Sequence, residues 1–234
     1  MVEANHNKIG GVPVSVRLII GVLIFGSIWG FLEATLGGFL NLIIFPNKGA
    51  IMSGIGMAIM GVALAFYRKP AMLPGIGIVA ASYKWLNAWL LFVPPNAVQI
   101  INPAMSIILE ALAFSLVAVF LMNRMEKNVH IGVWSAVLAG FMSAVAYVYF
   151  AVYVTHSPIF ARLGIKSIGE FMVGNGVIQA VFCGILAPLG YLAGKKLTAV
   201  ISHISARKSV YYAISTATVL GCLGFSALAI IAGL

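Results

Sequence analysis

Charge is scarce in this sequence: 8% of its 234 residues are Asp, Glu, Lys or Arg, whereas 62% are hydrophobic. A soluble domain carries roughly 25% charged residues, which it needs to cover its surface in water. The composition therefore argues against a cytosolic enzyme. It predicts one unit of a multi-pass integral membrane protein, with the lipid bilayer as its solvent and the cell membrane as its location.

Cysteine and histidine are also few. Cys183 and Cys222 both lie in apolar runs, which excludes a disulfide framework and the close cysteine spacing of a zinc site. The histidines fall in loops or at the ends of apolar runs, where they cannot face one another as haem ligands: His6, His130, His156 and His203. No HExxH pair and no GxxxxGK[ST] phosphate loop occurs. We expect no enzyme activity, no cofactor and no metal, so any use of ATP would come from a partner.

Acidic residues are the scarcest charges, with five Glu and no Asp against 14 Lys and Arg. The basic residues come in ones and twos between apolar runs, an arrangement that argues against nucleic-acid binding. Cytoplasmic loops of membrane proteins carry an excess of Lys and Arg. With a cytoplasmic N-terminus, the outer loops hold only Lys48, Arg162 and Lys166. The inner loops then hold Lys8, Arg17, Arg68, Lys69, Arg124, Lys127, Lys195, Lys196, Arg207 and Lys208.

Seven segments are apolar enough to be transmembrane helices, which need ~20 predominantly apolar residues. They lie near residues 16–36, 50–67, 71–93, 103–122, 131–153, 170–193 and 210–233. The predicted fold class is an all-α polytopic bundle of six to seven transmembrane helices, and seven crossings place the C-terminus outside. Gly37-Gly38 and Pro46 predict that the first helix ends early and that an apolar loop follows it.

These spans divide the chain into four parts. They are a cytoplasmic N-terminal segment (1–15), a six-helix membrane core (16–197), a basic cytoplasmic connection (198–209) and an additional C-terminal transmembrane helix (210–234). The connection either lies on anionic lipid or is an ordinary solvated loop of basic residues.

Ionisable side chains inside membrane spans are costly, so each one is a candidate functional residue. Here they are Glu33, Lys84, Glu110 and Glu170, and helix rise places all four in the outer half of the membrane. Polar or aromatic residues accompany them at Trp85, Asn87, Asn175 and Gln179. One alternative is purely structural: Lys84 forms an ion pair with Glu33 or Glu110, and the pair holds the helices together. One lysine cannot neutralise three glutamates, however, and the surplus charge predicts a cationic or amine-bearing ligand, or protonated acids.

Small residues recur every four positions in the first span, at Gly26, Gly30 and Ala34. Such a face lets another helix approach closely. The approaching helix belongs either to this chain or to a partner subunit.

The pattern resembles the substrate-binding S component of energy-coupling factor transporters over residues 15–197. The likeness lies in the connection GGFLNLIIFPNKGAIMSGIG, the basic turn YRKP, the segment NPAMSIILEA with a proline at its start, and the segment GNGVIQAVFCGILAPLGYLAGKKL. The resemblance implies six helices, a ligand held near the outer surface, and a lid formed by the loop with Asn41, Asn47 and Lys48. It also implies that Gly26, Gly30 and Ala34 dock a transmembrane coupling subunit that works with two ATPases. The seventh span departs from this family.

The leading hypothesis is therefore a membrane substrate-capture subunit for a small nutrient such as a vitamin, a vitamin precursor or an amine-bearing molecule. Its expected binding residues are Glu110, Glu170, Asn175, Gln179, Lys84, Trp85, Glu33 and Asn87. One alternative is a membrane anchor of a respiratory-type complex, in which Glu33, Lys84 and Glu110 form a proton or quinone path. Another is a stand-alone transporter coupled to protons through Glu110.

Overall fold

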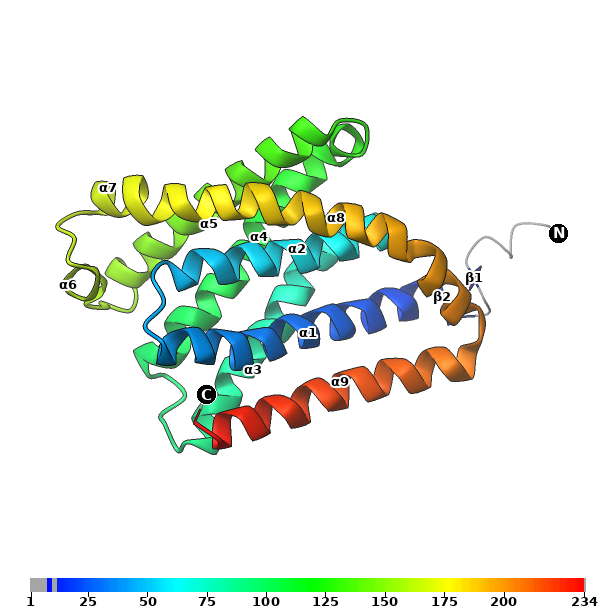
Figure 1. The fold of residues 1–234 in the computed structure, drawn as a ribbon, viewed down its shortest axis with the longest axis horizontal. Helices are drawn as coiled ribbons and strands as arrows, with labels where there is room; N and C mark the ends of the chain where they lie inside the picture. Colours follow the sequence, from blue (N-terminus) through cyan, green and yellow to red (C-terminus); the bar gives the residue numbers. More distant parts are fainter. Residues whose placement is uncertain (1–7, 10–11, 234) are drawn as a thin grey trace.

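The computed structural model describes residues 8–9 and 12–233, and nearly all of them are helical (Figure 1). A short antiparallel pair, β1 (Lys8–Ile9) and β2 (Val12–Pro13), precedes the first helix. The long helices are α1 (Val14–Leu42), α2 (Lys48–Tyr67), α3 (Leu73–Leu90), α4 (Val98–Met125), α5 (Val129–Tyr153), α8 (Val177–Ala206) and α9 (Lys208–Ile231). The short segments are η2 (Pro70–Met72), α6 (Ile159–Leu163), α7 (Ile168–Phe171) and the π-helical turn η3 (Met172–Gly176).

Six helices of the described chain are long and apolar enough to cross a membrane, so the protein is an all-α polytopic membrane protein. They are α1, α2, α4, α5, the continuous segment Ile168–Thr198 and α9. The third predicted span corresponds to α3, which is 18 residues long and is not among the six. It nevertheless runs from one end of the bundle towards the other (Figure 1). The helices α1 and α9 each run along the length of the bundle (Figure 1).

The first helix does not end early, contrary to the prediction from Gly37-Gly38. It continues through both glycines to Leu42, which leaves a loop of only residues 43–47. Glycine costs a helix about 1 kcal/mol relative to alanine. An apolar solvent offers the backbone no other hydrogen-bond partner, so continuing the helix outweighs that cost.

Two other predicted boundaries also move outward. The fourth helix begins at Val98, because Ala97 already accepts hydrogen bonds from the backbone N–H groups of Ile100 and Ile101, and Pro103 therefore lies inside the helix. The sixth predicted span ends at 193, whereas α8 continues to Ala206. Residues 198–206 of the predicted connection are therefore helical.

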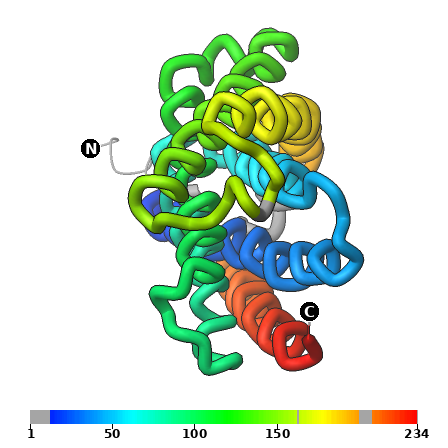
Figure 2. Tube along the Cα trace, turned by 90° about the vertical axis from the view of Figure 1, so that its left-hand side faces the viewer, coloured from blue at the N-terminus to red at the C-terminus, as the bar shows by residue number. Residues whose placement is uncertain are grey.

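Glycines let α2 and α8 pack closely. A methyl group at Gly190 would lie 2.0 Å from the backbone oxygen of Ala58, and one at Gly61 would lie 2.5 Å from that of Ala187. Seen end on, the two helices run side by side, and α1 lies beside α9 (Figure 2). Close backbone approach of this kind is how helices associate when water provides no hydrophobic drive between them.

The centre of the bundle is filled by large side chains of α1, α2 and α4. Trp29, Met57, Met60, Leu64 and Phe114 are each at most 1% exposed. On the outward faces, by contrast, many large apolar side chains are uncovered, including Leu220, Phe225 and Leu228 of α9. Exposed apolar surface of this extent matches a lipid environment, and α9 is the least buried of the six candidate spans.

Candidate functional site

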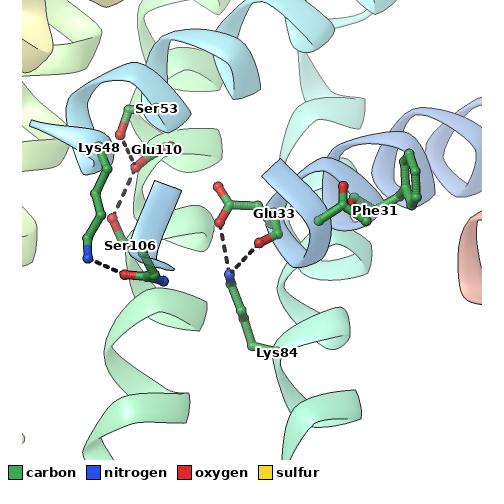
Figure 3. A network of polar contacts seen from close by, with 9 residues as sticks. Phe31, Glu33, Lys48, Ser53, Lys84, Ser106 and Glu110 are labelled. Atoms are coloured by element: carbon green, nitrogen blue, oxygen red, sulfur yellow. Dashed lines mark hydrogen bonds and ion pairs between the residues drawn. The ribbon is translucent and has the colours of Figure 1, made fainter. Parts of the chain in front are cut away.

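Lys84 of α3 and Glu33 of α1 form an ion pair inside the bundle (Figure 3). The Lys84 ammonium nitrogen lies 2.9 Å from Glu33 Oε2, and it also donates a hydrogen bond of 3.3 Å to the backbone oxygen of Glu33. The side chains of Lys84 and Glu33 are only 13% and 11% exposed. Both contacts of the Lys84 ammonium group are therefore with Glu33.

Glu110 of α4 is the most deeply buried carboxyl group of the described residues, with 3% of its surface exposed. Its Oε1 accepts two hydrogen bonds, one of 2.6 Å from the Ser53 hydroxyl on α2 and one of 3.0 Å from the Ser106 hydroxyl one turn earlier on α4. Its Oε2 is buried and has no hydrogen-bond partner among the described residues. One half of this carboxyl group is therefore ready to accept a donor.

The ion pair and the Glu110 hydrogen bonds lie in the same region between α1, α2, α3 and α4, and Figure 3 draws them as two separate sets of contacts. We refer to the two sets together as the polar cluster. Both Glu33 and Lys84 lie within electrostatic range of Glu110. With all three groups ionised, two negative charges face one positive charge, so the cluster lacks one cation. Such an imbalance is costly in a medium of low dielectric constant.

A tryptophan of α1 adds a second buried polar atom without a partner. Trp29 is fully buried, and a methyl group at Gly56 of α2 would lie 2.4 Å from its indole ring. Its Nε1 has no hydrogen-bond partner among the described residues. Trp29 lies one turn from Glu33 on α1, and Gly56 lies about one turn from Ser53 on α2. An unused donor and an unused acceptor therefore flank the same stretch of α2.

Glu170, in contrast, lies outside this cluster. It is exposed in the first turn of α7, where its Oε2 accepts a hydrogen bond of 2.7 Å from the backbone N–H of Lys166. Its own backbone N–H donates to the Ser167 hydroxyl at 3.2 Å. Ser167 is the N-cap of α7, and Glu170 accepts from the residue just before it, so the pair is a variant of the helix capping box. The contacts of Glu170 in this structure are therefore those of a residue that caps the helix start.

The remaining predicted binding residues are dispersed. Gln179 of α8 donates a hydrogen bond of 3.0 Å to the Ser143 hydroxyl on α5, and Asn175 lies half-buried in the π-helical turn η3. Trp85 is half-buried and packs against the apolar core. Asn87 Oδ1 is buried without a partner among the described residues, near the end of α3. Of the eight predicted residues, the structure brings Glu33, Lys84 and Glu110 together.

The predicted lid is shorter than expected. Asn41 belongs to α1 and Lys48 to α2, and the Lys48 ammonium group donates to Asn41 Oδ1 across the intervening loop. Asn47 precedes α2 with a φ of 55°. Within the loop, Ile44 is 86% exposed, so its side chain points away from the protein.

The predicted docking face of α1 is occupied by α3 of the same chain. A methyl group at Gly26 would lie 2.5 Å from Val79 Cβ, and one at Gly30 would lie 2.5 Å from the Tyr83 ring. Ala34 is 6% exposed. Of the two possibilities for this face, the structure shows packing within the chain, and the three residues leave no free surface for a partner.

Sequence reasoning missed Ser53, Ser106 and Trp29. Ser106 has a sequence signal, because a residue four positions before Glu110 shares its helix face. Ser53 has none, since it comes from another helix.

Comparisons of this chain with protein-family models, with curated proteins and with solved structures find no match. The resemblance to S components therefore stays a prediction from the sequence.

Proposed function

We propose that this protein binds a small amine-bearing solute inside the membrane, on Glu110, and takes part in its uptake. The observation that carries the proposal is the buried Oε2 of Glu110, which has no hydrogen-bond partner among the described residues and lies in a cluster of two carboxyl groups and one lysine. An ammonium group supplies both missing elements, a hydrogen-bond donor and a cation. A neutral ligand would supply only the first.

The depth of the cluster supports uptake from the side of the α1–α2 loop. Ser53 lies five residues into α2, ~7.5 Å of helix rise from Lys48, and Lys84 lies ~9 Å from the end of α3 at Leu90. These helix ends meet at the end of the bundle that the positive-inside rule assigns to the outside. A solute entering there reaches Glu110 before it crosses the apolar core.

The test uses the full-length protein in detergent. Small molecules released on denaturation are identified by mass spectrometry, and thermal shifts are measured with methylamine, putrescine, choline and thiamine. Glu110→Gln keeps the acceptor for Ser53 and Ser106 but removes the charge, so we expect the affinity for the retained amine to fall about tenfold or more. Glu170→Gln is the matched control, because it removes an exposed carboxylate and leaves the cluster intact.

Two results would overturn the proposal. One is a Glu110→Gln variant that retains the ligand as well as the wild type does. The other is the absence of any bound or stabilising amine across the panel, with the wild-type protein folded.

The source of energy has two candidates. A substrate-capture subunit would be driven by partner ATPases. A stand-alone transporter would exchange a proton on Glu110 for the solute, and the contact of Gly26 and Gly30 with α3 favours this second candidate, because the expected docking face for a coupling subunit is covered. Proteoliposomes that contain only this chain separate the two: uptake of the retained amine driven by an imposed pH gradient supports the stand-alone transporter, and failure of uptake until ATPases are added supports the capture subunit.

A further inference from the structure

A second feature lies at the opposite end of the bundle, in a groove between α4, α5 and α8. Its apolar lining includes Phe114, Met125, Val129, Ala187, Pro188 and Leu192. Gly132 of α5 also lines it, and a methyl group there would meet nothing within 4 Å. The volume is about 40 Å³, which is room for the side of a hydrocarbon chain but not for an enclosed solute.

The polar residues of this groove are Glu126, Tyr191 and Lys195. Glu126 pairs with Arg68, which extends from the end of α2 and is 64% exposed along its side chain. The Lys195 ammonium nitrogen lies 4.9 Å from the centre of the Tyr191 ring and has no carboxylate partner among the described residues. Two cations therefore face one acid, and one positive charge at the mouth of the groove is uncompensated.

Neighbouring residues increase this positive charge. Lys69, Arg124 and Lys127 are exposed around the ends of α2 and α4, and Glu126 is the only acid of the α2–α3 and α4–α5 turns. An anion is thus favoured at this rim, while hydrocarbon is favoured in the groove below it. A soluble anion would leave the apolar lining unused.

We propose that this groove binds an anionic phospholipid, with the phosphate on Lys195 and Arg68 and one acyl chain along Val129, Pro188 and Leu192. Basic pockets between transmembrane helices on the cytoplasmic side bind such headgroups, and the positive-inside rule assigns this end to the cytoplasm. The site is separate from the Glu110 cluster and does not depend on the proposed uptake function.

The experiment measures lipid binding to the full-length protein by native mass spectrometry from detergent, with phosphatidylglycerol and phosphatidylcholine of identical acyl chains. Lys195→Gln should weaken phosphatidylglycerol binding about fivefold, the value of one lysine near a membrane surface. Lys196→Gln is the matched control, since this neighbour has the same charge but does not line the groove. It should change binding less than twofold.

A second variant tests the acyl-chain half of the site without changing any charge. Gly132→Leu puts a side chain into the groove at a position where an added Cβ meets nothing within 4 Å. Lipid binding should fall at least as far as in Lys195→Gln, with the thermal unfolding of the variant measured to check that the fold is kept. Equal losses in Lys195→Gln and Lys196→Gln would overturn the proposal in favour of diffuse surface charge. Equal affinities for the two lipids, or inorganic phosphate binding that Gly132→Leu leaves unchanged, would also overturn it.

Discussion

The Lys84 ammonium nitrogen lies 2.9 Å from Glu33 Oε2, and this contact joins α3 to α1. The pair neutralises one of the two acids in the polar cluster. It leaves Glu110 to two serine hydroxyls, which supply hydrogen bonds but no positive charge. The predictions below follow from this difference between Glu33, which pairs with a lysine, and Glu110, which accepts hydrogen bonds from two serines.

Removing Lys84 should destabilise the protein strongly. In Lys84→Met, Glu33 keeps its charge in a buried position without a partner, so we expect the free energy of unfolding in detergent to fall by about 3 kcal/mol. The double variant Glu33→Gln/Lys84→Met should recover part of this loss. Arg68→Met breaks the exposed pair with Glu126 and should cost less than about 1 kcal/mol. An equal decrease in the free energy of unfolding in Lys84→Met and Arg68→Met would show that the buried pair contributes no more to stability than the exposed pair.

Adding a side chain at Gly30 should destabilise the protein even when it is purified without any partner subunit. A methyl group there would lie 2.5 Å from the Tyr83 ring, so Gly30→Ala should lower the stability by about 1–3 kcal/mol through overpacking against α3. Gly37→Ala on the same helix meets its nearest atom at 3.7 Å and should be neutral or should stabilise by up to about 1 kcal/mol. The stabilities of Gly30→Ala and Gly37→Ala are compared with that of the wild type by thermal unfolding of the purified proteins. An undisturbed Gly30→Ala would reopen the possibility that this face serves a partner.

Ser53 and Glu110 should be energetically coupled. Their hydrogen bond of 2.6 Å joins α2 to α4, so Ser53→Ala should cost about 1.5–3 kcal/mol when Glu110 is charged. In a Glu110→Gln background the same change should cost about 1 kcal/mol, because the acceptor is then neutral. A double-mutant cycle measures the difference. Additive effects would mean that the serine does not interact with the charged carboxylate.

Glu170 should behave as a capping residue. Glu170→Gln keeps a side-chain acceptor for the Lys166 N–H, as glutamine does at this position of a capping box, and should change stability by only a few tenths of a kcal/mol. Ser167→Ala removes the side-chain acceptor at the start of α7 and should cost about 1 kcal/mol. Neither variant should alter retention of a bound amine in the mass-spectrometric assay. Loss of the ligand in Glu170→Gln would place this acid back in the binding site.

Hydropathy located the helices of this protein, but not their ends. The signals at Gly37-Gly38 and Pro103 are calibrated on helices in water, where a broken helix finds solvent for its backbone groups. In the described chain both helices extend past these residues, to Leu42 in α1 and back to Val98 in α4. Boundaries were least predictable where the surroundings are apolar, since there the backbone has no alternative partner.

The polar cluster was predictable only in part. Helix rise placed Glu33, Lys84 and Glu110 at a shared depth, and the structure brings these three together. Depth along a helix does not specify the direction in which a side chain points. Glu170 and Gln179 share the predicted half of the membrane, yet they make their hydrogen bonds to Ser167, Lys166 and Ser143 instead.

The sequence by itself determined the solvent of this protein, its helical class and the short set of buried charges, because each of these follows from composition and from spacing along one chain. The tertiary structure decided which charges meet. Lys84 could have paired with either acid, and the packing of α1 on α3 through Gly26 and Gly30 brings it to Glu33. Glu110 is consequently left with the hydroxyls of Ser53 and Ser106, and its other oxygen has no hydrogen-bond partner in the part of the chain that the structure describes. That outcome depends on the rotation of each helix about its axis, which only contacts between helices set.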